Sequence, residues 1–155
     1  MKKWIFLLCL IGFFTSCTED VKFNNPAFQT LKDKDFWRAQ TYKAHLETNG
    51  TVVIEGSLGY ENVILKTASS EEGTYVLGNN DVSKGIYTNT LPSAAVSFST
   101  GTNSGSGQII ITELNTANNT ISGTFRFTAV NEDQTNTEKP SINFTEGVFY
   151  KVPIQ

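Results

Sequence analysis

The chain has 155 residues, a length typical of one domain, and carries 12 Lys and Arg residues against 15 Asp and Glu residues, a formal net charge of −3. A protein that follows nucleic-acid phosphates needs a basic surface, and this chain has two arginines, Arg38 and Arg126, and no basic cluster, so we exclude nucleic acid as a partner. Gly, Thr, Asn and Ser are plentiful, which favours strands joined by turns over helices.

The first 16 residues have the pattern of a secretory signal peptide. Two lysines precede an apolar run over residues 4–14, which is shorter than the roughly 20 residues that cross a bilayer. The run is apolar on every face and no helix start or stop signal frames it, which argues against a buried amphipathic helix. Two small residues and then Cys17 follow the run. We therefore predict a signal peptide over residues 1–16.

The residues at the end of this segment, Phe14-Thr15-Ser16-Cys17, resemble the lipobox of bacterial lipoproteins, although Phe14 stands where Leu is more usual. The resemblance implies that Cys17 is the lipidated first residue of the mature chain and that the lipid binds a membrane. Each buried CH₂ contributes about 0.8 kcal/mol, so two or more acyl chains anchor a protein stably. The alternative, a structural cysteine in a soluble protein, leaves Cys9 unexplained in the middle of the apolar run.

Removal of the signal peptide would change the chemistry of the mature chain in two ways. Loss of Lys2 and Lys3 would take the net charge from −3 to −5, so the lipid and not basic side chains would hold the domain at an anionic membrane. With Cys9 removed and Cys17 lipidated, no free thiol would remain. Disulfides, thiolate catalysis and cysteine metal sites are therefore excluded.

After this segment we predict a tether over residues 17–24 and a single all-β domain over residues 25–155. At the start of the domain, Asn25-Pro26 is typical of a helix start, with Asn as the cap and Pro at the first helical position. Phe28 and Leu31 are three residues apart and could pack one turn onto the body. This pattern predicts a short N-terminal helical turn.

From Phe36 onward the hydrophobic pattern has period two, which is typical of strands. Eight or nine strands are expected, because one of the candidate segments is very brief: 37–47, 52–58, 63–67, 73–78, 86–87, 95–100, 108–114, 121–129 and 141–154. Asn49-Gly50 predicts a hairpin turn, and Gly147 suggests a β-bulge. Short connections leave no room for helical crossovers, so neighbouring strands should be antiparallel. We expect an antiparallel β-sandwich or a flattened β-barrel, which differ in whether the first and last strands pair.

Six short segments follow one another in the order NPAF, WRA, GTYVLG, GQIIIT, ISGTFRF and GVF, beginning at residues 25, 37, 73, 107, 121 and 147. Together they resemble an uncharacterised family of Bacteroidota lipoproteins, the DUF6252-like proteins, over roughly residues 23–153. The resemblance implies a compact all-β lipoprotein of a Gram-negative envelope and no catalytic residue.

In such an envelope, Thr18-Glu19-Asp20 looks like the short acidic signals that send lipoproteins of this phylum to the outer leaflet of the outer membrane. We expect a protein that is lipid-anchored to the outer membrane and exposed at the cell surface. The alternative is a solvated tether whose acids keep it extended.

Catalytic and metal-binding patterns are weak in this chain. His45, the single histidine, alternates onto a charged strand face, and no G-x-S-x-G elbow accompanies it. Four glutamates that could serve as paired carboxylates fall on expected solvent faces or in turns, namely Glu55, Glu61, Glu113 and Glu146. The oxygen-rich segments 79–81 and 131–133 do not match a calcium loop. We expect no enzyme activity, no metal and no cofactor.

Aromatic side chains provide the remaining candidate binding residue. Trp37 starts a strand beside Arg38 and could stack on a sugar ring or a partner, although core packing is the simpler interpretation. The sequence therefore favours a non-enzymatic binding or interaction module with a protein or glycan ligand. The alternatives are a carbohydrate-binding or hydrolytic accessory protein of the envelope, and a purely structural spacer.

Overall fold

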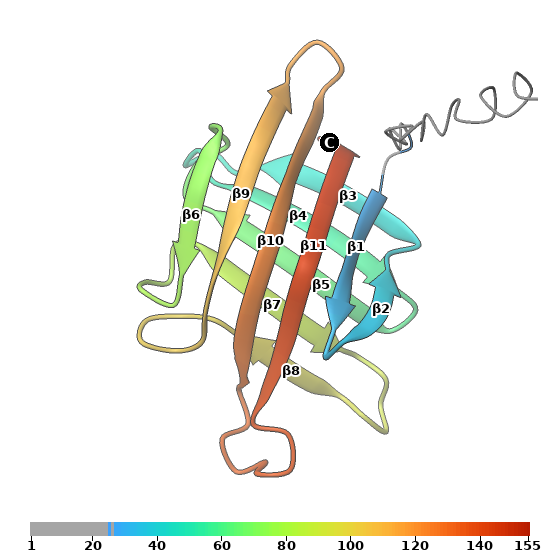
Figure 1. Ribbon diagram of the computed structural model, residues 1–155, viewed down its shortest axis with the longest axis vertical. Coiled ribbons are helices and arrows are strands. Elements are labelled where there is room, and N and C mark those ends of the chain that lie inside the picture. The colour runs from blue at the N-terminus through green and yellow to red at the C-terminus, as the bar shows by residue number, and fades with distance from the viewer. Residues whose placement is uncertain (1–24, 26) are drawn as a thin grey trace, which may run out of the picture.

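The computed structural model describes residue 25 and residues 27–155, and this part of the chain folds into β-strands (Figure 1). The strands are β1 Ala27–Lys32, β2 Asp35–Arg38, β3 Thr41–Leu46, β4 Val52–Leu58, β5 Glu61–Thr67, β6 Gly73–Leu77, β7 Lys84–Asn89, β8 Val96–Ser99, β9 Ser106–Asn115, β10 Thr120–Asn131 and β11 Ser141–Pro153. Every ladder between them is antiparallel, which confirms the predicted all-β antiparallel class. None of the described residues belongs to a helix of the length and hydropathy that would cross a membrane.

The predicted N-terminal helical turn is wrong for residues 27–31, which belong to strand β1. Phe28 and Thr30 both point inward and are buried, so the segment has period two and not the period of a helix. β1 pairs with β11 on one side and β2 on the other. Two ladders therefore outweigh the local helix-start signal of Asn25-Pro26, of which Pro26 lies outside the described residues.

The strand predicted over residues 37–47 is divided in two. β2 ends at Arg38 and β3 begins at Thr41, and the two residues between them bind different partners. The Ala39 amide donates to the Phe28 carbonyl at 2.9 Å, and the Gln40 amide donates to the Ser57 carbonyl at 2.8 Å. The chain thus leaves the front layer, where it pairs with β1, and enters the back layer, where it pairs with β4, between Ala39 and Gln40. With β1, this division accounts for eleven strands in place of the expected eight or nine.

The sheet is one curled half-barrel, in which the strand order is β2-β1-β11-β10-β8-β7-β5-β4-β3 and β9 and β6 branch from β10. Figure 1 shows two crossing layers, a front layer of β6, β9, β10, β11, β1 and β2 and a back layer of β3, β4, β5, β7 and β8. Strand β10 joins them, because it pairs with β9 and then with β8. At the other end, a single bridge from Ala44 to Ile154 brings β3 to the end of β11. The first and last strands, β1 and β11, are paired.

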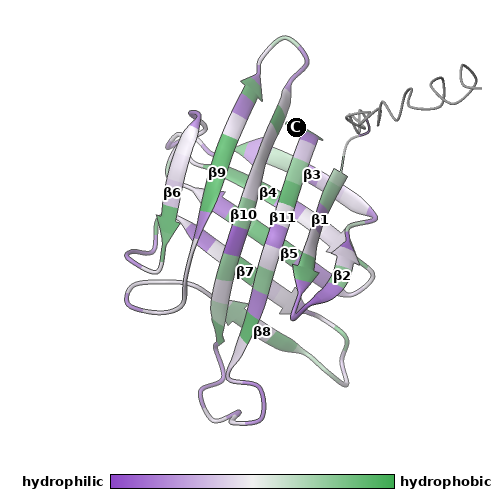
Figure 2. Cartoon of the chain, in the orientation of Figure 1, coloured by the Kyte–Doolittle hydropathy of each residue, from purple (hydrophilic) through white to green (hydrophobic). Residues whose placement is uncertain are grey.

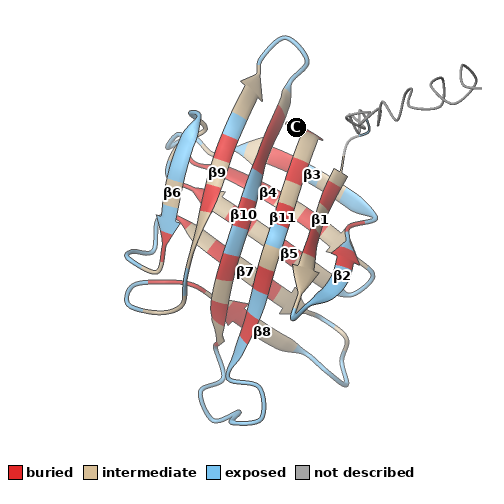
Figure 3. Cartoon of the chain, viewed as in Figure 1, coloured by how far each residue is buried: buried red, intermediate tan, exposed pale blue. Residues whose placement is uncertain are grey.

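The core fills the space between the two layers. Figures 2 and 3 show apolar, buried positions alternating with hydrophilic or exposed ones along β10 and β11. The largest fully buried side chains are Phe28, Phe98, Phe144 and Phe149. Burial of a side chain of this size contributes roughly 1.5–3 kcal/mol, so the aromatic residues dominate the stability of the fold.

Glycines beside these rings allow β10 and β11 to approach each other closely. Gly123 pairs with Phe149 and Phe125 pairs with Gly147, so each ring covers the glycine opposite it. A Cβ atom at Gly147 would lie 2.6 Å from the Phe125 ring, and one at Gly123 would overlap the Phe149 ring and the Ile110 carbonyl oxygen. These positions require glycine because the facing ring occupies the space of a side chain.

Strand β11 also contains the bulge predicted at Gly147. The pairing of β10 with β11 shifts register between Phe125–Gly147 and Phe127–Phe144. Glu146, inside this interval, has a φ of 53° and is exposed. The bulge therefore turns the Glu146 side chain out over the front layer.

Candidate functional site

The sequence-predicted site residues fall in two places. Cys17 and the acidic segment Thr18-Glu19-Asp20 lie outside the described residues. Trp37 lies on β2 in the core, with 2% of its surface exposed, and packs edge-on against Phe28 with ring centroids 6.1 Å apart. Trp37 therefore packs in the core and is not available to stack on a ligand, since its ring has no free face toward solvent.

Trp37 is joined to a polar group of residues that we call the interlayer cluster: Lys32, Trp37, Glu61 and Tyr87. The Trp37 indole N–H donates to Glu61 Oε2 at 2.7 Å, and the Tyr87 hydroxyl donates to Glu61 Oε1 at 2.7 Å. The Lys32 ammonium pairs with the same carboxylate and lies 5.3 Å from the centre of the Tyr87 ring. Since β1 and β2 belong to the front layer and β5 and β7 to the back layer, Glu61 ties the two layers together.

Glu61 was expected on a solvent face or in a turn, and its side chain instead points between the layers. It precedes Val63 and Leu65 by two and four residues, and both of these are fully buried. The period-two pattern could therefore have placed Glu61 on the inward face. Its three donors could not have been found in this way, because they come from three other strands.

The environment of the interlayer cluster fixes the charge states of its members. Burial raises the pKa of Glu61, but hydrogen bonds from Lys32, Tyr87 and Trp37 outweigh burial and hold that pKa below its ordinary value of 4.5. Burial, together with the hydrogen bond to Glu61, raises the pKa of the Tyr87 hydroxyl far above 10.0. At neutral pH the cluster therefore holds an ionised carboxylate and a neutral phenol.

This arrangement does not resemble the acid and base of a glycoside hydrolase. Such an enzyme needs one carboxyl group whose pKa is raised, so that it can donate a proton. The neighbouring Asp33 accepts hydrogen bonds from the Asn143 amide and the Lys139 ammonium, both at 2.9 Å, which lower its pKa despite the opposing effect of burial. Both Asp33 and Glu61 are therefore ionised ion-pair partners, and we interpret the cluster as structural.

The other candidates from the sequence are dispersed. Glu55 pairs with Lys43 at 3.5 Å on β3 and β4, and His45 is partly exposed beside them on β3. Glu113 and Glu146 lie on β9 and β11. Among residues 25 and 27–155 no group of three or more His, Cys, Asp and Glu side chains is placed to hold a metal ion.

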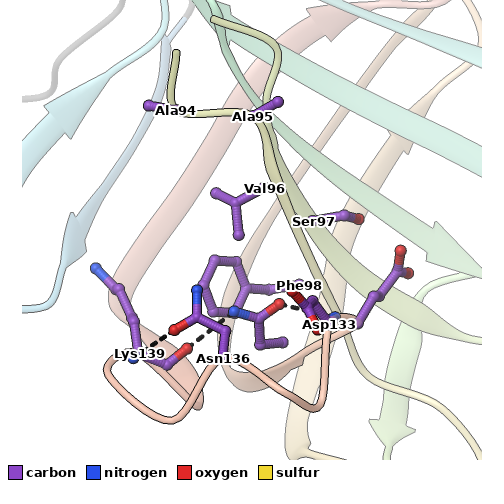
Figure 4. Close-up of a pocket in the computed structure, with 10 residues that line it drawn as sticks. Ala94, Ala95, Val96, Ser97, Phe98, Asp133, Asn136 and Lys139 are labelled. Carbon is purple, nitrogen blue, oxygen red and sulfur yellow. Dashed lines mark hydrogen bonds between the residues drawn. The ribbon is translucent and has the colours of Figure 1, made fainter. Parts of the chain in front are cut away.

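One hollow lies at the end of the molecule that bears the β10–β11 loop, and Figure 4 shows its lining. It has a volume of about 450 Å³, with Ala94, Ala95 and Val96 on one side and the β10–β11 loop on the other. Several polar side chains of the loop already have partners in the loop or in the β1–β2 turn. The Asn136 side chain accepts from the Lys139 amide at 3.2 Å, and the Lys139 ammonium pairs with Asp33. The Asn136 and Lys139 polar groups therefore stabilise the conformation of the loop.

A concave surface lies on the outer face of the front layer, the face turned to the viewer in Figure 1. Three hollows of about 620, 500 and 420 Å³ lie on it. The first two share Gln29 and Val148, and the last two share Gln108 and Arg126, so the three are continuous. We call this surface the outer-face groove.

Cross-strand register explains how the groove is assembled. Five outward-facing residues on neighbouring strands stand opposite one another in one row, which runs Arg38, Gln29, Val148, Thr124 and Ile110 from β2 to β9. Alternation along β10 places Arg126 on the same face as Thr124. The outer-face groove is thus lined by guanidinium, amide and hydroxyl groups and the Glu146 carboxylate, together with apolar side chains such as Val148, Ile110 and Tyr150.

Comparison with known proteins gives one match. The sequence model of a protein family described as "Domain of unknown function (DUF6252)" matches residues 24–153. No curated protein and no solved structure matches the chain. The match covers all of the described strands.

Proposed function

Since the chain belongs to the DUF6252 family, a domain of unknown function, we propose a function from its own residues: it is a lipid-anchored envelope protein that binds a ligand in the outer-face groove. The observation that carries this proposal is the groove itself, a continuous concave surface on five neighbouring strands that is lined by side chains able to form hydrogen bonds. Ligand sites combine concavity with a few convergent polar groups in this way.

The proposed anchor is a lipid on Cys17, which would limit the distance of the domain from the membrane. Figure 1 shows that the start of β1 and the C-terminus lie at one end and the β10–β11 loop at the other. Eight residues, 17–24, would separate the lipid from the domain, a reach of at most about 28 Å when fully extended. The tether would keep the start of β1 within this distance of the membrane.

Single cysteines test both location and binding. In the mature lipoprotein an engineered cysteine would be the one free thiol, so we would compare Thr124→Cys, in the groove, with Lys43→Cys, on the outer face of the back layer. A membrane-impermeant maleimide should label both in intact cells if the protein is on the cell surface. A bound ligand should slow the labelling of Thr124→Cys in cells relative to the purified protein and leave Lys43→Cys unchanged.

The outcomes separate the alternatives. If both cysteines react only after the cells are opened, the surface location is wrong and the protein faces the periplasm. If both react equally fast in cells and in purified protein, the groove is empty and the structural-spacer alternative is favoured. Replacement of Cys17 by Ala should release the protein from the membrane fraction and abolish incorporation of a labelled fatty acid. Retention of the variant in the membrane with its label would contradict the anchor.

A further inference from the structure

We propose that the outer-face groove binds an acidic oligosaccharide, and that Arg38 and Arg126 each pair with one of its carboxylates. This inference depends on the proposed binding role and specifies the class of ligand.

Most lysines of the described residues form ion pairs, although Lys34 does not, and neither arginine does. Five ion pairs are present, and all five use a lysine: Lys32 with Glu61, Lys43 with Glu55, Lys66 with Glu47, Lys84 with Asp81 and Lys139 with Asp33. Neither arginine forms an ion pair with a described residue, although the chain has more acids than bases. Arg126 donates one long hydrogen bond, 3.4 Å, to Gln108 Oε1.

The arginines are also the residues best suited to an anionic ligand. A guanidinium group presents a planar fork that matches a carboxylate with two parallel hydrogen bonds, whereas a lysine presents a compact point charge. Both Arg38 and Arg126 are exposed, and both line the outer-face groove. Of the residues that line its three hollows, one is acidic, Glu146. The groove is thus a cationic surface on an acidic protein.

The spacing of the two arginines favours an extended ligand. Arg38 lies on β2 and Arg126 on β10, with β1 and β11 between them. Three steps of about 4.8 Å between neighbouring strands separate the two positions by about 14 Å across the sheet. A chain with more than one acidic group can pair with both arginines without drawing the two side chains toward each other.

The other residues that line the groove favour a sugar over a peptide. Gln29, Thr124 and Gln108 offer amide and hydroxyl groups that can exchange hydrogen bonds with sugar hydroxyls, and Val148 and Ile110 offer apolar contacts. A peptide that adds to a sheet uses free backbone N–H and C=O groups at an edge. On this face the backbone groups of β1, β11 and β10 are already paired in ladders, so side chains alone make the contacts.

The experiment measures the affinity of the purified full-length protein, in mild detergent, for a tetramer of galacturonic acid and for its uncharged methyl ester. We expect the acid to bind at least about tenfold more tightly than the ester, because an ester group cannot accept a fork of charge-assisted hydrogen bonds. Arg38→Gln and Arg126→Gln should each weaken binding of the acid by about tenfold, and the double variant should weaken it further. The matched control is Lys43→Gln, which removes an exposed cation from the other layer and should leave the affinity within about twofold.

Removal of the Glu146 charge should have the opposite effect on affinity from removal of an arginine. Glu146 lines the groove beside Arg126 and would repel an anionic ligand, so Glu146→Gln should tighten binding several-fold. Raising the salt concentration should weaken binding of the acid, because the contacts are exposed charges. Both effects distinguish pairing with the arginines from nonspecific association with the domain.

Several results would overturn the inference. Equal affinity for the acid and its ester, no binding of the acid, or unchanged binding in both arginine variants would each contradict an acidic sugar. Binding of a polyglutamate peptide of equal charge, with the same dependence on the arginines and in preference to the sugar, would assign the groove to acidic peptides instead. In these cases slower labelling of Thr124→Cys in cells would still support an occupied groove, so the failure of the ligand class is distinguishable from the failure of the binding role.

Discussion

The interlayer cluster and the outer-face groove both consist of polar side chains on neighbouring strands, but they differ in how their polar groups are satisfied. In the cluster, the two oxygens of Glu61 accept hydrogen bonds from Lys32, Trp37 and Tyr87, all within the domain. In the groove, neither Arg38 nor Arg126 has an acidic partner among the described residues. Groups that are saturated by the fold stabilise it, whereas exposed cations without such partners can pair with a ligand. Changes in the two regions should therefore affect different measurements.

The largest effect on stability should come from Glu61→Ala. This change leaves the buried indole N–H of Trp37 without its acceptor and Lys32 without its counter-ion. An unsatisfied buried donor costs about 1–3 kcal/mol, and the half-buried ion pair adds to this, so the free energy of unfolding should fall by about 3 kcal/mol.

Urea denaturation measures this change, and Glu146→Ala is the matched control. Glu146 is an exposed glutamate of the groove, so its removal should change the free energy of unfolding by less than about 0.5 kcal/mol. Similar losses in the two variants would mean that the cluster is no more structural than the surface.

The second-largest loss of stability is expected for Gly123→Ala, in the strands beneath the groove. Gly123→Ala places a Cβ atom against the Phe149 ring and the Ile110 carbonyl oxygen, and the strands cannot separate without breaking ladder hydrogen bonds. We expect a loss of about 2 kcal/mol, in the range for overpacked cores. Thr124→Ala, one residue further along the same strand and exposed, should change stability by less than about 0.5 kcal/mol. A Gly123→Ala variant as stable as Thr124→Ala would show that the close approach is not required.

A smaller effect should appear as a dependence on pH. The pKa of Glu61 is lower in the folded protein than its ordinary value of 4.5, so the ionised form stabilises the fold above that pH. This contribution is lost as the pH falls from 4.5 through the lowered pKa. Glu61→Gln lacks it at every pH, so the stability difference between the native protein and the variant should shrink between pH 7 and pH 3. Urea midpoints at the two pH values measure it, and a difference that stays constant would contradict the assigned charge state.

The smallest effect on stability is expected for the two arginines. Arg38→Gln and Arg126→Gln remove exposed charges that have no ion-pair partner among the described residues, so each should change the melting temperature by no more than Lys43→Gln does. Thermal unfolding followed by circular dichroism checks this. Marked destabilisation by either arginine change would place that residue in the structure of the domain and remove it from the ligand site.

Most strands could be predicted from the sequence, because each buries one face, and burial of one face produces a period-two pattern of apolar residues. The prediction failed at β1, where a local helix-start signal stood beside a segment whose structure depends on pairing with β2 and β11. Alternation alone placed Thr124 and Arg126 on the outer side of β10. Alternation could not place Arg38 in the same groove, because residues 88 positions apart become neighbours only through the strand order.

The most direct test of this account is a titration of the isotopically labelled protein with the galacturonic acid tetramer, followed by NMR of the backbone amides and of the indole N–H of Trp37. We expect the amides of Gln29, Gln108 and Val148 to shift on binding and the Trp37 indole resonance to stay in place. A shift of the Trp37 resonance with no change at the groove amides would mean that the interlayer cluster, and not the outer-face groove, is the ligand site.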